Sequence, residues 1–205
     1  MAIDTLATLR TAVSNWLARD DLTPYVDDLI LTGEKYMHRK VRCPEMETSF
    51  SDAIASDGTM DVPDFFVAWK WVAITGTPYR SLKVRTASYV MENFPLRGSD
   101  VKPTCIARDG ANFIFGPFPN SEYTVVGTYY KRPESILAGV NDLFAANPDL
   151  YLFSALAESV VFLKDDKRVG GWAAKRDQVI MSVNQEAKDN DNTGTSQTTV
   201  DFAAG

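Results

Sequence analysis

Histidine and cysteine are scarce in this 205-residue chain, and their scarcity excludes several kinds of catalytic site. His38 is the single histidine, and Cys43 and Cys105 are the two cysteines. A serine or cysteine nucleophile activated by histidine would need that one imidazole, so acyl transfer by such a pair is not expected. One histidine and two distant cysteines also cannot supply the ligands of a zinc site.

Motifs for cofactors and other metals are missing as well. Neither the phosphate-binding pattern G-x-x-x-x-G-K-[ST] nor the dinucleotide-binding pattern G-x-G-x-x-G occurs. Residues 189–200 resemble the first half of a calcium loop, but Val200 stands where a bidentate glutamate is required. We therefore predict no catalytic residue, no cofactor and no metal site, and interpret the cysteines as unpaired, partly buried thiols.

The apolar stretch NPDLYLFSALAESVVFL, residues 147–163, does not have the length of a membrane span. Crossing a bilayer takes about 20 apolar residues. Here Asp149 and Glu158 interrupt the stretch, and KDDKR follows it. The first residues, MAIDTLATLR, also lack the pattern of a signal peptide. We expect no membrane contact and a cytosolic origin.

The net charge of −6 argues against nucleic-acid binding. Neutralisation of phosphates by cations supplies most non-specific affinity for DNA, and an acidic protein gains nothing from it. An acidic surface is nevertheless compatible with a wall that DNA slides past without sticking.

Apolar residues recur at helical spacing in two pairs of segments. We predict helices over 3–18, 23–42, 147–163 and 167–188, each pair forming a hairpin. Thr23 followed by Pro24 is typical of a helix start. Asp166 is expected to cap the last helix, and Gly170 with Gly171 predicts a kink or a late start there.

Between the helical pairs, residues 46–133 have the pattern of short strands. β-Branched and aromatic residues alternate with turn residues, and RDGA at 108–111 is a clear hairpin signal. A short helical turn is predicted at 87–94. The fold class is therefore α+β: an N-terminal helical hairpin, a small antiparallel β-rich middle, a C-terminal helical hairpin and an extended tail.

Residues 1–188 are expected to form a single domain, and the polar residues 189–205 a tail that a partner orders. The helix over 147–163 is apolar nearly all round, which indicates burial on more than one side. Its cover can come from the sheet and the last helix of the same chain or from a neighbouring subunit, and the composition permits either.

Several strings in this order resemble the adaptor, or head-to-tail connector, proteins of tailed bacteriophages, in particular those of short-tailed phages. The strings are NWLARDDLTPYVDDLILTGEKYMHRKVR (15–42), MDVPDFFVAWKWVAI (60–74), GANFIFGPFPNSEYTVVGTYYKRP (110–133) and NPDLYLFSALAESVVFLKDDKRVGGWAAKRDQ (147–178). They span nearly the whole chain apart from the tail. The ordered set carries the resemblance, and the family pattern often has larger residues at Gly170 and Gly171.

The resemblance implies a structural virion protein at the head–tail interface rather than an enzyme. Such proteins form a ring, expected to be dodecameric, beneath the portal protein. The ring offers a platform to the next tail component, a nozzle or tail tube, and encloses a channel through which DNA passes without specific binding. Host cytoplasm is then the site of synthesis.

Residue roles follow as expectations from that reading. The helical hairpins are expected to build the ring body, with subunit packing through Trp16, Leu152, Leu156 and Trp172. The β-rich middle is expected to face a tail partner through Trp69, Trp71, Phe113 and Phe118. Val200 and Phe202 are the apolar anchors of the tail, which we expect to dock on the portal or on a neighbour.

Two alternatives from other classes stay open. Aromatic residues on the strands suit a carbohydrate- or peptide-binding module on a helical scaffold, although such residues more often fill a sheet core. A lytic or nuclease accessory enzyme is the other alternative.

Overall fold

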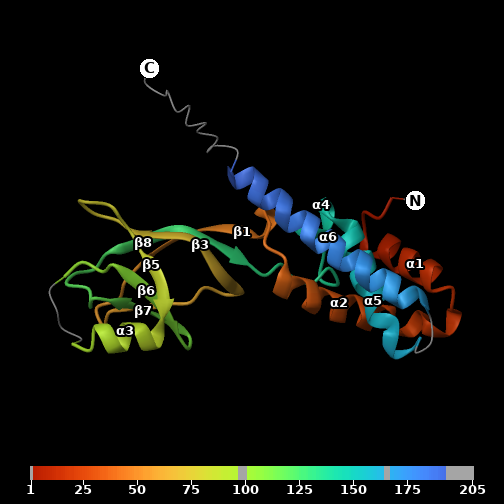
Figure 1. Cartoon of the computed structure of the whole chain (residues 1–205), viewed down its shortest axis with the longest axis horizontal. Helices are drawn as coiled ribbons and strands as arrows, with labels where there is room; N and C mark the ends of the chain where they lie inside the picture. Colours follow the sequence, from red (N-terminus) through yellow and green to blue (C-terminus); the bar gives the residue numbers. More distant parts are fainter. Residues whose placement is uncertain (1, 97–100, 164–166, 193–205) are drawn as a thin grey trace, which may run out of the picture. The chain divides into compact units, whose positions relative to one another are not determined.

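The computed structural model describes residues 2–96, 101–163 and 167–192 (Figure 1). The chain divides into a helical unit, residues 1–45 with 133–205, and a β-rich unit, residues 46–132. The chain thus leaves the helical unit after Glu45 and returns to it at Pro133. The predicted α+β class is confirmed, and the single domain over 1–188 stays a prediction.

The first two helices form where the apolar spacing predicted them. Helix α1 covers Leu6–Leu17; Thr5 and Thr8 form a reciprocal capping box at its start, and Ala18 ends it in the left-handed conformation. Helix α2 covers Val26–Lys40. The prediction that Thr23 caps α2 is wrong, because Thr23 and Pro24 lie in a 3-10 helix, Asp20–Tyr25, that precedes it.

The second helical pair contains an additional short helix. Helix α4, Asp142–Ala146, is capped by Asn141, and α5 follows as Pro148–Glu158, with Pro148 in the first turn. A 3-10 turn, Ser159–Val161, ends this segment. Helix α6 covers Lys167–Asn192 and includes both glycines, so the expected late start is not observed. The predicted cap Asp166 lies outside the described residues.

Helix α5 lies at the centre of the helical unit. Helices α1, α2, α4 and α6 all pack against it (Figure 1). Residues around its whole circumference are buried: Leu150, Tyr151, Leu152, Ser154, Ala155, Leu156 and Ala157. The sequence did not decide whether this helix is covered by its own chain or by a neighbouring subunit. Over these residues, helices of the same chain cover it.

Close approach of α2 to α5 depends on Gly33. A Cβ built on Gly33 would lie 2.7 Å from the carbonyl carbon of Ser154 and 2.9 Å from the nitrogen of Ala155. Because both atoms belong to the backbone of α5, neither can move aside without shifting the helix. This position therefore sets how closely the two helices pack.

Arg176 connects α6 to its neighbours. Its side chain is only 9% exposed and contacts Glu158 at 3.3 Å and Asp177 at 3.0 Å. The guanidinium carbon also lies 3.6 Å from the centre of the Tyr36 ring on α2. One cation is thus shared among three helices.

The β-rich unit contains two four-stranded sheets. The first has the order β1-β8-β3-β4 and the second β2-β7-β6-β5. The strands are β1 Glu47–Ala53, β2 Thr59–Asp61, β3 Phe66–Ile74, β4 Arg80–Ser81, β5 Lys83–Thr86, β6 Cys105–Asp109, β7 Asn112–Gly116 and β8 Thr124–Lys131. Side chains of both sheets form one core, which includes Ile54, Val72, Ile106, Phe115 and Val125.

The second sheet and the helix that packs on it confirm two local predictions. One strand pairing in this sheet was not predicted. Strands β6 and β7 form the predicted hairpin, turning through Gly110 with φ of 61°. The predicted short helix is α3, Ala87–Asn93, which packs against β5, β6 and β7. Strand β5 pairs with β6 in parallel, a pairing that the antiparallel expectation did not contain; α3 lies in the connection between the two strands.

Candidate interaction surfaces

The part of the chain that the structure describes holds no group of three or more histidine, cysteine or acidic side chains placed to bind a metal. Cys43 and Cys105 are both buried and unpaired with each other. Burial raises the pKa of the Cys105 thiol, which makes it a poor nucleophile. His38 is buried on α2.

Glu34 is a buried carboxylate with a structural role in the helical unit. Only 4% of the residue is exposed. Its Oε1 accepts a hydrogen bond from the Ile136 nitrogen at 2.7 Å, and its Oε2 accepts one from the Ser135 hydroxyl at 2.6 Å. Burial nevertheless raises the pKa of Glu34 above its ordinary value. The carboxylate thus ties α2 to the chain that enters α4.

A group of apolar side chains is exposed where α1 ends and α5 gives way to its 3-10 turn. We call it the aromatic patch; it comprises Trp16 (48% exposed), Tyr25 (45%), Val160 (49%), Val161 (69%) and Phe162 (37%). The rings of Tyr25 and Phe162 lie 4.9 Å apart, and Trp16 packs edge to face at 5.7 Å on Phe153, a half-buried residue of α5 outside the patch. Exposed apolar side chains are candidate sites of protein interaction when they form a contiguous surface, so we treat this patch as a candidate.

Among the residues predicted for subunit packing, only Trp16 is open to a neighbour in this way. Leu156 is fully buried, and Leu152 and Trp172 are 5% and 7% exposed. Their burial stabilises the helical unit itself. A role of these residues in subunit contacts stays a prediction.

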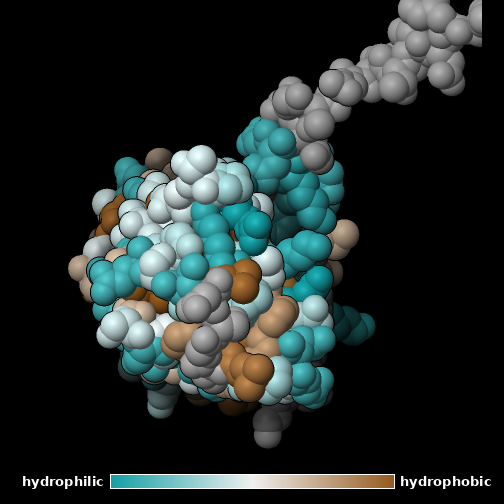
Figure 2. All heavy atoms as spheres, turned by 90° about the vertical axis from the view of Figure 1, so that its left-hand side faces the viewer, coloured by the Kyte–Doolittle hydropathy of each residue, from teal (hydrophilic) through white to brown (hydrophobic). Residues whose placement is uncertain are grey.

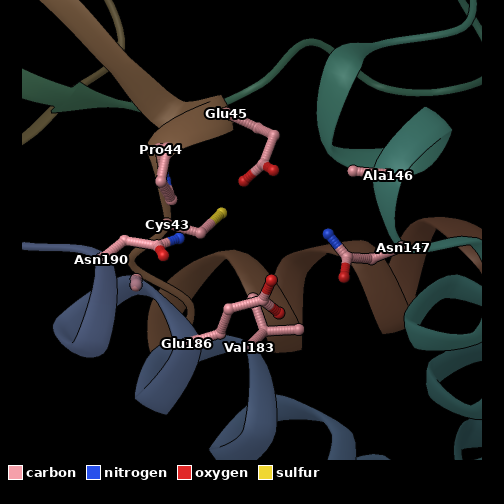
Figure 3. A pocket seen from close by; sticks show the side chains of 9 residues that line it. Cys43, Pro44, Glu45, Ala146, Asn147, Val183, Glu186 and Asn190 are labelled. Carbon is pink, nitrogen blue, oxygen red and sulfur yellow. The ribbon is translucent and has the colours of Figure 1, made fainter. Parts of the chain in front are cut away.

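The helical unit also contains a small acidic hollow of about 130 Å³ (Figure 3). The side chains of Cys43, Glu45, Asn147 and Glu186 point toward it from three parts of the chain. Its volume is well below the roughly 300–1,000 Å³ that is typical of small-molecule sites. We therefore do not assign it a substrate.

The residues predicted for a tail partner occupy different layers of the β-rich unit. Phe113 is buried in the core, and Trp69 is half-buried against that core. Trp71, in contrast, is 49% exposed, and Phe118 is half-buried beside Gly58. Figure 2 shows a mostly hydrophilic surface with a few small apolar groups. Of the four residues, Trp71 is the one presented most fully to solvent.

A larger cavity opens in the β-rich unit between strands of the two sheets. Its volume is about 350 Å³, and β3, β5, β6 and β7 line it with residues that include Trp69, Val84, Arg85, Arg108 and Phe113. The walls are mainly apolar, and the two arginines lie at exposed positions. In the described part of the unit neither guanidinium forms an ion pair.

Except for Trp16, the residues of the aromatic patch were not predicted from the sequence as a surface. Neither were the two arginines of the cavity. Tyr25 and Phe162 have the spacing of core residues, so their sequence pattern does not distinguish exposure from burial. The one sequence signal for the open edge beside the cavity was Arg85 in the strand KVRT, since cations are common on an edge strand. The anchors Val200 and Phe202 lie outside the described residues.

No helix among the described residues is long and apolar enough to span a membrane. A comparison with protein-family models identifies the class of protein: residues 4–200 match the SU10 adaptor protein family, and the chain belongs to that family. No curated protein matches the chain.

Membership of this family makes the chain a structural adaptor protein of a bacteriophage. It is a component of the virion that interacts with other head or tail components. The predicted resemblance is thereby confirmed at the level of the phage adaptor.

Proposed function

We propose that this adaptor forms a ring, expected to be a dodecamer, beneath the portal protein and passes DNA through its centre to the next tail component. The family supports the structural role, and the aromatic patch is the observation that favours a ring. An exposed patch that includes Trp16, Tyr25 and Phe162 is stabilised when a neighbouring subunit covers it.

The net charge supports passage of DNA rather than its retention. At −6 the chain lacks the cationic excess that binds phosphates, so a ring of such subunits does not attract the DNA backbone. The main alternative is a sheet that binds carbohydrate or peptide. Its carbohydrate-binding form has less support than the ring. Of its candidate aromatics, Phe113, Phe115 and Tyr129 are buried and serve the core.

Co-elution with the portal protein tests this proposal. The purified adaptor, alone and mixed with the portal of the same virus, is passed over a size-exclusion column. We expect the wild type to co-elute with the portal and Phe162→Asp to elute mainly alone, because a charge in the patch cannot be desolvated. Lys35→Glu, an exposed change on α2 outside the patch, is the control and should co-elute. A wild-type adaptor that stays monomeric beside an intact portal would sink the proposal.

A further inference from the structure

The outer edge of strand β5 is an open position in the second sheet. In the order β2-β7-β6-β5, this strand pairs with β6 on one side only, and no described strand pairs with the other side. All four of its residues, Lys83–Thr86, are exposed. No other described strand lies along it, and Thr86 at its end also caps α3. Such an edge is a template for an added strand.

The 350 Å³ cavity lies directly beside this edge. Val84 and Arg85 of β5 contribute to its lining, together with Trp69, Phe113 and Arg108. Val84 is 54% exposed, and the indole Nε1–H of Trp69 is buried without an acceptor among the described residues. The site thus combines a free edge, an apolar cavity for a side chain and an unused hydrogen-bond donor.

The charges around the site favour an acidic occupant. Lys83 and Arg85 on the edge and Arg108 beside it are cations in a chain whose net charge is −6. Two copies of β5 placed edge to edge would bring these like charges together, which is unfavourable. An extended segment that carries an acidic residue and apolar side chains fits instead.

One segment of this chain outside the described structure has that composition. Residues 198–202 read TTVDF, in which β-branched and aromatic residues favour a strand. In an extended conformation Val200 and Phe202 point to one side and Asp201 to the other. We propose that this segment of one copy adds to the outer edge of β5 in a second copy, with Phe202 in the cavity and Asp201 near the cations.

This inference rests on the proposed ring, because it needs two copies side by side. A segment of each copy that binds a different surface of the next copy is a heterologous contact, and such contacts form a ring when the rotation between neighbours closes. The tail and the aromatic patch would then provide two separate links between neighbours.

Photo-crosslinking between isotopically distinct copies tests the contact in the full chain. The photoreactive analogue p-benzoylphenylalanine replaces Phe202 in unlabelled protein, which is mixed with 15N-labelled wild type, with and without the portal. After irradiation, mass spectrometry of the peptides identifies both partners. We expect crosslinks to residues 66–69 or 83–86 of the labelled copy. The same analogue at Thr193 is the positional control and should not crosslink there.

A charge exchange tests the same contact through its expected ion pair. Arg85→Glu and Asp201→Arg should each lower the yield of this crosslink about two- to fivefold, as for an exposed ion pair, and the double variant should restore it. Arg39→Glu, an exposed arginine of the helical unit, should leave the yield unchanged.

Crosslinks confined to one copy, to the helical unit or to the portal would overturn the inference, as would the absence of any crosslink. A double variant that does not recover would do the same. Co-elution with the portal is read separately, so loss of this contact with retained co-elution leaves the proposed function standing.

Discussion

Gly33 shows how much a single missing side chain contributes in the helical unit. An added Cβ would meet backbone atoms of α5 at 2.7 and 2.9 Å, closer than real Cβ atoms approach. Alanine has a higher helix propensity than glycine by about 1 kcal/mol. The overlap with a neighbouring helix outweighs that gain, because a close-packed backbone cannot yield locally.

We therefore predict opposite effects for two glycine-to-alanine substitutions in the same unit. Gly33→Ala should lower the free energy of unfolding by about 1–3 kcal/mol, as overpacking does. Gly171→Ala should raise it by about 0.5–1 kcal/mol, because a Cβ there meets nothing within 4 Å and the residue lies in a helix. Urea denaturation followed by circular dichroism measures both. Equal effects of the two substitutions would contradict the close contact.

Glu34 makes the stability of the protein depend on pH. Because burial raises its pKa in the folded state above the ordinary 4.5, the folded chain holds this proton more tightly than the unfolded chain does. The resulting stability is fully present below pH 4.5 and is lost as the pH rises through the raised pKa.

Glu34→Gln should remove this dependence. The amide keeps an acceptor for the Ile136 N–H and a donor for Ser135, so the variant gains on the wild type as the pH rises from 4.5 toward 8. The gain is about 1.4 kcal/mol for each unit by which the pKa is raised. Free energies of unfolding across this range measure it, and parallel curves for the two proteins would contradict the account. Glu34→Ala leaves the Ile136 N–H unsatisfied and should cost about 1–3 kcal/mol.

At the scale of the elements, α5 combines a buried helix with an exposed end. Leu156 is fully buried, whereas Phe162, beyond the helix, is 37% exposed in the aromatic patch. The two residues stand in one continuous apolar stretch of the sequence. Their substitution should nevertheless affect different properties of the protein.

Leu156→Ala should lower the free energy of unfolding by about 2–5 kcal/mol, since it removes a core side chain. Phe162→Ala should change it by less than about 1 kcal/mol but weaken co-elution with the portal. Thermal melting and size-exclusion chromatography of the same preparations separate the two effects. If Phe162→Ala melted like Leu156→Ala, the patch would be part of the core instead of a surface for a neighbour.

Deletion of residues 193–205 tests the tail as an element. The deletion begins after the last residue of α6, so no described contact is lost and the melting temperature should stay unchanged. Assembly on the portal should weaken, because the anchors Val200 and Phe202 are removed. A control chain in which only these two residues become serine should behave like the deletion. Unchanged assembly of both would show that the tail is dispensable.

The sequence predicted the type of each main element but not its partners. The period of apolar residues identified α1, α2, α5 and α6, and Asp109-Gly110 identified the β6–β7 hairpin. Gly33 of α2 meets Ser154 of α5 across more than a hundred positions of the sequence, and no local pattern reports such a contact. The division into two sheets and the parallel β5–β6 pair depend on long-range pairing in the same way.

For the whole molecule, the structure and the family agree on a protein that works by assembly. Described residues provide an aromatic patch on the helical unit and an open strand edge beside a cavity in the β-rich unit. Under the proposed function, both are surfaces for protein partners.

The mass of the complex with the portal shows whether the adaptor assembles on it as a ring. Light scattering after size-exclusion chromatography measures the mass of the portal alone, the adaptor alone and their mixture. We expect the portal to gain close to one adaptor per portal subunit, which corresponds to a ring of adaptors beneath the ring of portal subunits. A mixture that elutes as free portal and monomeric adaptor would contradict it.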